Sequence, residues 1–188
     1  MQDVLDLADR VAGGLSPATP PIREYFEQLR LRGRLRVTLT DARTGALEAD
    51  SGWFDNLIVN NGWDNYIIAS LAAFAGAQQI NYLALSTRTT TIQPTDTTVT
   101  GEVGGRKQLT ATNNTAIANR KTGVSLGQLQ LFSTWTPADL GAFPLVLGAA
   151  ATYDLSQAST MCSAGLLPTP LQWTPTQNVN VTYAFGKI

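Results

Sequence analysis

The sequence predicts a mainly β protein: an antiparallel β-sandwich of jelly-roll-like type, with one packed α-helix and an N-terminal helical arm. Short apolar segments recur through most of the 188 residues, separated by Gly, Pro and Asn turns at intervals typical of a sandwich. Within the β-rich part of the chain, only residues 62–75 repeat apolar residues at helical spacing. We therefore divide the chain into an arm, residues 1–32, and a β-sandwich domain, residues 33–188.

The arm combines a short helix with a stiff linker. Val4, Leu5 and Ala8 recur at helical spacing before two glycines end the pattern. Residues 16–21 contain three prolines, which favour an extended linker, and a second short helix is expected over residues 22–28. Because a lone helix of about ten residues is marginal in water, we expect its apolar side to dock on another chain or on its own domain.

A β-hairpin is expected to open the sandwich. Leucine and valine alternate with four arginines from residue 29 to residue 40, which predicts a half-buried strand with the arginines on one face. Residues 41–45 form a turn, and residues 47–59 form the second strand, with a bulge near Gly52. The four arginines are Arg30, Arg32, Arg34 and Arg36.

The arginine row has two open interpretations. It forms a solvated or internally paired face, with Glu48 and Asp50 across the hairpin as partners. Alternatively, it binds an acidic strip on a neighbouring protein, because guanidinium groups suit carboxylates and phosphates. Nucleic acid is disfavoured as the partner, because no aromatic residues are interleaved to stack on bases.

The remaining elements follow in order. Residues 62–75 form the helix, with Trp63, Ile67, Leu71 and Phe74 on its apolar face. Residues 80–86 form a strand, the threonine-rich residues 87–100 an exposed loop, and residues 101–105 a flexible turn. Further strands are expected at residues 107–112, 116–118, 124–135, 146–153, 160–167 and 179–185.

Composition excludes several kinds of chemistry. The chain contains no histidine and one cysteine, Cys162, which argues against most zinc sites and against histidine-dependent nucleophilic catalysis. We expect Cys162 to be buried and Glu102 and Asp139 to be solvated or to cap turns, so no enzyme activity and no cofactor are predicted. Core packing is the preferred role of the tryptophans, with a sugar-binding platform as the alternative. They are Trp53, Trp63, Trp135 and Trp173.

Charge and hydropathy narrow the partners. The formal net charge of −1 gives no general attraction to nucleic acid or to an anionic membrane. The longest apolar stretch, residues 66–75, is much shorter than the roughly 20 residues that cross a bilayer. The N-terminus lacks the pattern of a secretory signal, which indicates synthesis in the cytoplasm. The expected partners are therefore proteins.

The order of motifs resembles a group of virion structural proteins of tailed bacteriophages, described as minor capsid, decoration, neck or tail-accessory proteins. The resemblance spans about residues 33–188 and rests on these segments: Gly33–Val37, Asp41–Gly45, Asn56–Gly62, Ile80–Thr87 and Val179–Phe185. Residues 86 and 88 depart from the glycines common in that group. The group supplies no catalytic residues to carry over.

This resemblance implies a non-enzymatic virion component made in the bacterial host cytoplasm. It would act as a head decoration or head-to-tail accessory protein, as a homo-oligomer, with phage coat, portal or tail proteins as partners. The alternative is a tail fibre or baseplate module that binds a host receptor or glycan. The candidate contact residues are Val4, Leu5, Ala8, Arg30, Arg32, Arg34 and Arg36.

Overall fold

The predicted β-rich architecture is confirmed in the part of the chain that the structure describes. The structure is a computed structural model that describes residues 31–72, 75–108, 128–157 and 159–187. Its strands are β1 (Leu31–Asp41), β2 (Leu47–Asp55), β3 (Leu57–Ile58), β4 (Tyr82–Ser86), β5 (Glu102–Gln108), β6 (Gln128–Trp135), β7 (Leu145–Tyr153), β8 (Ser163–Trp173) and β9 (Gln177–Lys187). The helical elements are a π-helix η1 (Gly62–Ile68), its continuation α3 (Ala69–Leu71) and a 3₁₀ turn η2 (Pro137–Asp139).

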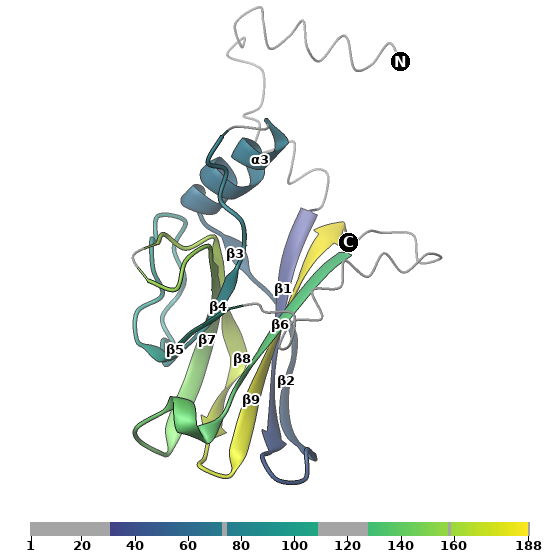
Figure 1. Cartoon of the computed structure of the whole chain (residues 1–188), viewed down its shortest axis with the longest axis vertical. Coiled ribbons are helices and arrows are strands. Elements are labelled where there is room, and N and C mark those ends of the chain that lie inside the picture. Colours follow the sequence, from purple (N-terminus) through teal and green to yellow (C-terminus); the bar gives the residue numbers. More distant parts are fainter. Residues whose placement is uncertain (1–30, 73–74, 109–127, 158, 188) are drawn as a thin grey trace, which may run out of the picture. The chain divides into compact units, whose positions relative to one another are not determined.

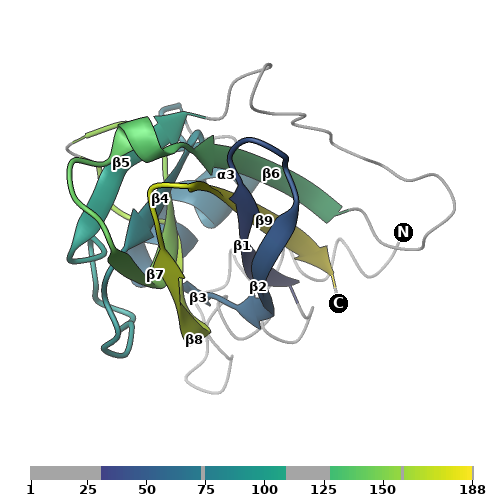
Figure 2. The same ribbon diagram turned by 90° about the horizontal axis from the view of Figure 1, so that it is seen from below.

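The strands form two antiparallel sheets that pack in a sandwich-like arrangement (Figures 1 and 2). One sheet has the order β2-β1-β9-β6, and the other has the order β3-β8-β7-β4-β5. The main core lies between them and takes buried side chains from both, such as Leu35 and Val181 from the first sheet and Leu83 and Leu147 from the second. Each of these four is fully buried, which contributes about 1.5–3 kcal/mol per side chain.

The predicted hairpin is confirmed, including its turn and its bulge. β1 pairs with β2, and the Asp41 amide donates to the Ala46 carbonyl across the turn at 2.8 Å. Gly45 has a φ of 73°, which only glycine adopts at little cost. The register shifts between Arg36 and Thr38 because the opposite strand bulges at Gly52, whose φ is 66°.

The prediction of one continuous strand over residues 47–59 is wrong. β2 ends at Asp55, and after Asn56 the chain enters the other sheet, where β3 pairs with β8. Glycine at position 33 allows this crossing, because a Cβ there would lie 2.2 Å from the Asn56 side chain. The Asn56 amide also donates to the Gly33 carbonyl at 3.1 Å.

The helix begins where predicted but has a different buried face and an earlier end. Trp63, Tyr66 and Ala69 are buried. Leu71, which was predicted to lie on the apolar face of the helix, is 66% exposed. The first seven residues are π-helical, and the wider i→i+5 turn changes which side chains share a face. α3 ends at Leu71 rather than near residue 75, and predicted Phe74 lies outside the described residues.

The threonine-rich loop, residues 87–100, is not simply exposed as predicted. Ile92 and Val99 are buried in a second apolar cluster with Ala149 and Ala151 of β7. Ala150, which lies between these two alanines, packs in the main core, so the second cluster lies on the opposite side of the five-stranded sheet. Small side chains on that side leave room for the loop backbone to pack closely. A Cβ at Gly148 would lie 2.3 Å from the carbonyl oxygen of Arg88 in the loop.

Two further strand boundaries differ from expectation. Residues 101–105 are not a separate flexible turn, because Gly104 and Gly105, both at positive φ, belong to β5. β8 runs from Ser163 to Trp173, so it begins and ends later than the strand predicted over residues 160–167, and it contains Pro168 and Pro170. Both prolines fall at a register shift against β7, where an irregular strand tolerates the missing amides.

Several predictions lie outside the described residues. They include the arm from residue 1 to residue 30 and the expected strand segments within residues 109–127. The later strands are otherwise confirmed, and β9 alternates as predicted, with Val179, Val181 and Tyr183 buried.

Candidate functional site

Three of the predicted contact residues lie side by side on β1. Arg32, Arg34 and Arg36 alternate with the buried residues Leu35 and Val37, so they project from the face opposite the main core. Their side chains are 57%, 42% and 38% exposed. The remaining predicted contact residues, Val4, Leu5, Ala8 and Arg30, lie outside the described residues.

The arginines form ion pairs across the hairpin. Arg34 Nε donates to Asp55 Oδ1 at 3.1 Å, and Arg32 Nη1 lies 3.5 Å from Asp55 Oδ2. Arg36 Nε donates to Asp50 Oδ1 at 3.0 Å, and this hydrogen bond lowers the pKa of Asp50. The internally paired interpretation thus describes these three side chains, although the predicted partner Glu48 accepts from Gln177 instead. Because Asp55 serves two arginines, the row keeps one guanidinium in excess of its carboxylates.

Sequence reasoning missed a fourth member of this surface. Trp53 pairs directly with Arg36 in the β1–β2 register, so both project from the same face, and Trp53 is 42% exposed. The core prediction is therefore wrong for Trp53 and confirmed for the other three tryptophans, all buried. The alternation with buried Phe54 was the available signal. We call Arg32, Arg34, Arg36 and Trp53 the hairpin face.

An uncharged polar row continues the same sheet beyond the hairpin face. Thr134 Oγ1 donates to Asn180 Oδ1 at 2.7 Å, and Asn180 Nδ2 donates to Thr40 Oγ1 at 3.2 Å. These contacts link β6, β9 and β1, and all three side chains are only half-buried. The outer surface of the four-stranded sheet is therefore charged and aromatic at β1 and β2 and neutral toward β6.

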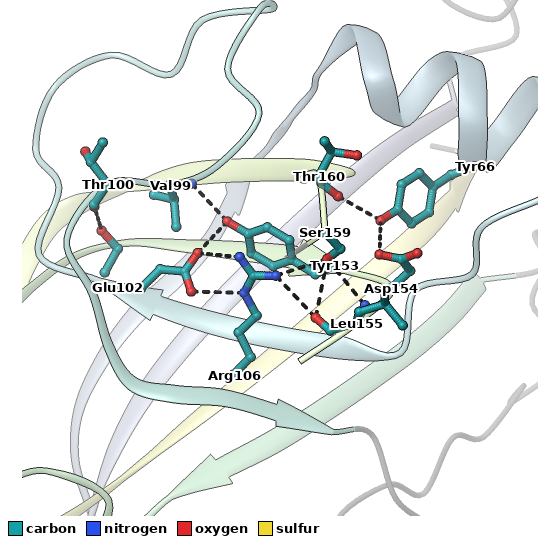
Figure 3. A network of polar contacts seen from close by, with 11 residues as sticks. Tyr66, Val99, Thr100, Glu102, Arg106, Tyr153, Asp154, Leu155, Ser159 and Thr160 are labelled. Atoms are coloured by element: carbon teal, nitrogen blue, oxygen red, sulfur yellow. Dashed lines mark hydrogen bonds and ion pairs between the residues drawn. The ribbon is translucent and has the colours of Figure 1, made fainter. Parts of the chain in front are cut away.

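A second group of polar side chains lies beneath the loops over the five-stranded sheet (Figure 3). Glu102 accepts two hydrogen bonds from Arg106, at 3.0 and 2.9 Å, and one from the Tyr153 hydroxyl at 2.7 Å. The Arg106 guanidinium stacks on the Tyr153 ring, 3.3 Å from its centroid. The Tyr153 hydroxyl also accepts from the Val99 amide at 2.9 Å, so the group joins β5, β7 and the threonine-rich loop.

The same group fixes the loop that follows β7. Arg106 Nη1 donates to the Leu155 carbonyl at 3.2 Å and to Ser159 Oγ at 3.0 Å. Nearby, the Tyr66 hydroxyl donates to the Thr160 carbonyl at 2.9 Å and lies 3.3 Å from Asp154 Oδ1 (Figure 3). Burial raises the pKa of Tyr66, which stays a neutral donor.

These and neighbouring contacts give Glu102, Asp139 and Cys162 structural roles in the fold. The prediction that Glu102 is solvated or caps a turn is wrong, since both its oxygens are committed to Arg106 and Tyr153. Asp139 caps η2 as predicted, with the Thr136 amide donating to it at 2.7 Å, and it also pairs with Lys107. Cys162 is buried as predicted, and burial raises the pKa of its thiol to about 12.

Within the described ranges, no group of three or more acidic, cysteine or histidine residues is placed to hold a metal ion. Of the helices in that part of the chain, none combines the length and apolar character needed to cross a membrane.

Comparison with known proteins gives no match to a family model, to a curated protein or to a solved structure.

Proposed function

We propose that this protein is a non-enzymatic structural component of a tailed-phage virion, acting as a head decoration or head-to-tail accessory protein. In this proposal, a jelly-roll-like sandwich carries an N-terminal helical arm, and both the arm and the sheet surface bind neighbouring coat, portal or tail proteins. The assignment to a virion rests on the sequence resemblance. The assignment to a binding role rests on the hairpin face.

The hairpin face is the observation that carries the binding role. It presents an exposed tryptophan directly beside Arg36 on the outer face of the four-stranded sheet, and tryptophan and arginine are among the residues most enriched at energetically important protein contacts. The excess guanidinium favours a partner surface with at least one carboxylate near Arg32, the most exposed of the three arginines. Repeated copies on a particle would convert a modest contact into stable attachment.

The direct test is addition of purified protein to phage particles assembled without it. We expect the chain to co-sediment with particles and to be visible on them by electron microscopy. Trp53→Ala and Arg34→Glu should each weaken co-sedimentation at least tenfold. Arg43→Glu, which makes the same charge change in the exposed turn, should leave it unchanged. Particles that never bind the wild-type chain would refute the proposal.

The second candidate is a tail fibre or baseplate module that binds a host receptor or glycan. The exposed Trp53 ring, bordered by the Arg36–Asp50 pair, is the observation that favours it. Such a module should bind host cells or immobilised sugars without particles, and Leu5→Asp in the predicted arm should not affect that binding. An accessory protein should bind particles instead, and Leu5→Asp should weaken the attachment.

A further inference from the structure

The strand that carries Trp53 has one residue more than the strand it pairs with. Arg36 of β1 lies opposite Trp53 of β2. Between that pair and the next one toward the turn, Val37 alone stands on β1, whereas Ser51 and Gly52 both stand on β2. One residue therefore faces two, which is the arrangement of a β-bulge.

The extra residue sets the side of the sheet to which Trp53 projects. Asp50 accepts a hydrogen bond from Arg36 on the outer side of the sheet. Along a regular strand every second residue projects to the same side, which from Asp50 would bring Phe54 outward. Instead, Trp53 is 42% exposed and Phe54 is buried, so the bulge reverses the alternation. The aromatic member of the hairpin face therefore depends on the bulge keeping its place.

A chain of hydrogen bonds through Ser51 holds the bulge. The Val37 amide donates to Ser51 Oγ at 2.9 Å, and the Ser51 hydroxyl donates to the Gly52 carbonyl at 2.8 Å. The Gly52 amide donates to Asp50 Oδ1 at 2.9 Å. The same oxygen accepts from Arg36 Nε at 3.0 Å. Ser51 thus ties the bulge to β1, and Asp50 ties the bulge to the arginines of the hairpin face.

We propose that Ser51 is a positioning residue of the hairpin face: its hydroxyl fixes the bulge and thereby the outward projection of Trp53. One hydroxyl can serve both strands because it accepts and donates at once. Val37 is fully buried, and a buried amide that loses its acceptor is costly. Without the hydroxyl the bulge is free to move along the strand, and a shift of one position turns Trp53 to the other side of the sheet.

The inference rests on the proposed function, in which Trp53 is a contact residue, but its first test needs no partner. That test is NMR of the full, isotopically labelled chain, in which each of the four tryptophans gives one indole N–H signal. Trp53→Phe identifies the signal of Trp53. Ser51→Ala should shift that signal and leave the other three in place. It should also accelerate hydrogen exchange of the Val37 amide about tenfold relative to the Val181 amide of the same sheet.

Two isosteric variants isolate the hydroxyl. Ser51→Thr keeps the hydroxyl, and Ser51→Val replaces it with a methyl group of similar size. Ser51→Thr should give the wild-type Trp53 signal and Val37 exchange, whereas Ser51→Val should behave like Ser51→Ala. Because threonine and valine both suit a strand, this comparison does not depend on Ser51→Ala being folded.

Thr44→Ala is the matched control in the same hairpin. The Thr44 hydroxyl also serves two partners, since it donates to Asp41 Oδ1 at 2.7 Å and accepts from the Ala46 amide at 3.3 Å. These contacts lie in the turn, away from the bulge. Thr44→Ala should therefore leave the Trp53 signal and the exchange of the Val37 amide unchanged.

Co-sedimentation with particles then links the position of Trp53 to binding. At a temperature where every variant is folded, Ser51→Val should weaken attachment about as much as Trp53→Ala, and Ser51→Thr should bind as the wild type does. An unmoved Trp53 signal in Ser51→Val, an equal shift in Thr44→Ala or in Ser51→Thr, or full particle binding by Ser51→Val would each overturn the inference. A wild type that binds no particles would refute the proposed function instead, and the NMR result would still decide whether Ser51 positions Trp53.

Discussion

Replacing Glu102 by glutamine tests whether the polar group under the loops holds this part of the fold together. The Arg106 side chain is only 7% exposed, and its opposite charge is supplied by Glu102 through two hydrogen bonds. Glu102→Gln keeps the size of the side chain but leaves the guanidinium without a counter-charge. Breaking a buried pair in this way costs about 3–5 kcal/mol. Because Glu102 is itself 26% exposed, water can compensate in part, and we expect about 3 kcal/mol.

The assay is thermal and urea unfolding of the full chain. A loss of about 3 kcal/mol corresponds to a fall in Tm of about 6–12 °C for a chain of this size. Glu48→Gln is the matched control, because Glu48 is exposed and bonds only one side chain in the described region, and it should change stability by less than about 0.5 kcal/mol. Arg106→Gln combined with Glu102→Gln should cost less than the sum of the two single changes. Equal effects of Glu102→Gln and Glu48→Gln would refute the reasoning.

Three further predictions concern pH, thiol reactivity and packing. The hydrogen bond from Arg36 lowers the pKa of Asp50. The stability that the Asp50 carboxylate contributes should therefore be complete above its unfolded-state pKa of about 3.9 and be lost as the pH falls through its lower folded-state pKa. The Tm difference between wild type and Asp50→Asn should shrink below about pH 4, and a constant difference would contradict this. Cys162 should resist a maleimide at pH 8 in the folded protein and react fully in urea, because the thiolate is the reactive form; rapid labelling of the native state would argue against its burial. Gly148→Ala should lower the free energy of unfolding by about 1–3 kcal/mol and speed proteolysis of the threonine-rich loop. Gly141→Ala is the control, because a Cβ at Gly141 would meet open space, and it should have neither effect. Equal behaviour of the two variants would show that the loop does not pack against Gly148.

The parts of the fold that the sequence predicts well are those governed by local alternation. β1 and β9 each show a regular two-residue period, and the structure confirms the pairing of β1 with β2 and the buried faces of both strands. The end of β2 at Asp55, where the chain crosses to the other sheet, could not be predicted from alternation. Residues 47–59 continue a strand-like composition, and only the contact between Asn56 and Gly33, 23 positions apart, decides where the chain changes sheets.

The same limit applies to the polar group around Glu102. Tyr153 is 51 residues away in the chain, and Ser159 is 53 residues from Arg106. Only the spacing of four between Glu102 and Arg106 was visible, and on an irregular strand that spacing does not predict contact. The hairpin face was half predictable: the arginine row follows from alternation, but the phase of Trp53 depends on the bulge at Gly52.

The loop packed on the outside of the five-stranded sheet has a consequence for how this sequence can change over time. Ala149, Ala151 and Gly148 must stay small, because larger side chains would push away a segment of the same molecule. Substitutions on that side of the five-stranded sheet are therefore constrained by the need of the chain to fold. Under the proposed function, substitutions on the hairpin face are selected by the partner that binds there. Relatives that have changed partner should differ at Arg32, Arg34, Arg36 and Trp53 and retain the alanines.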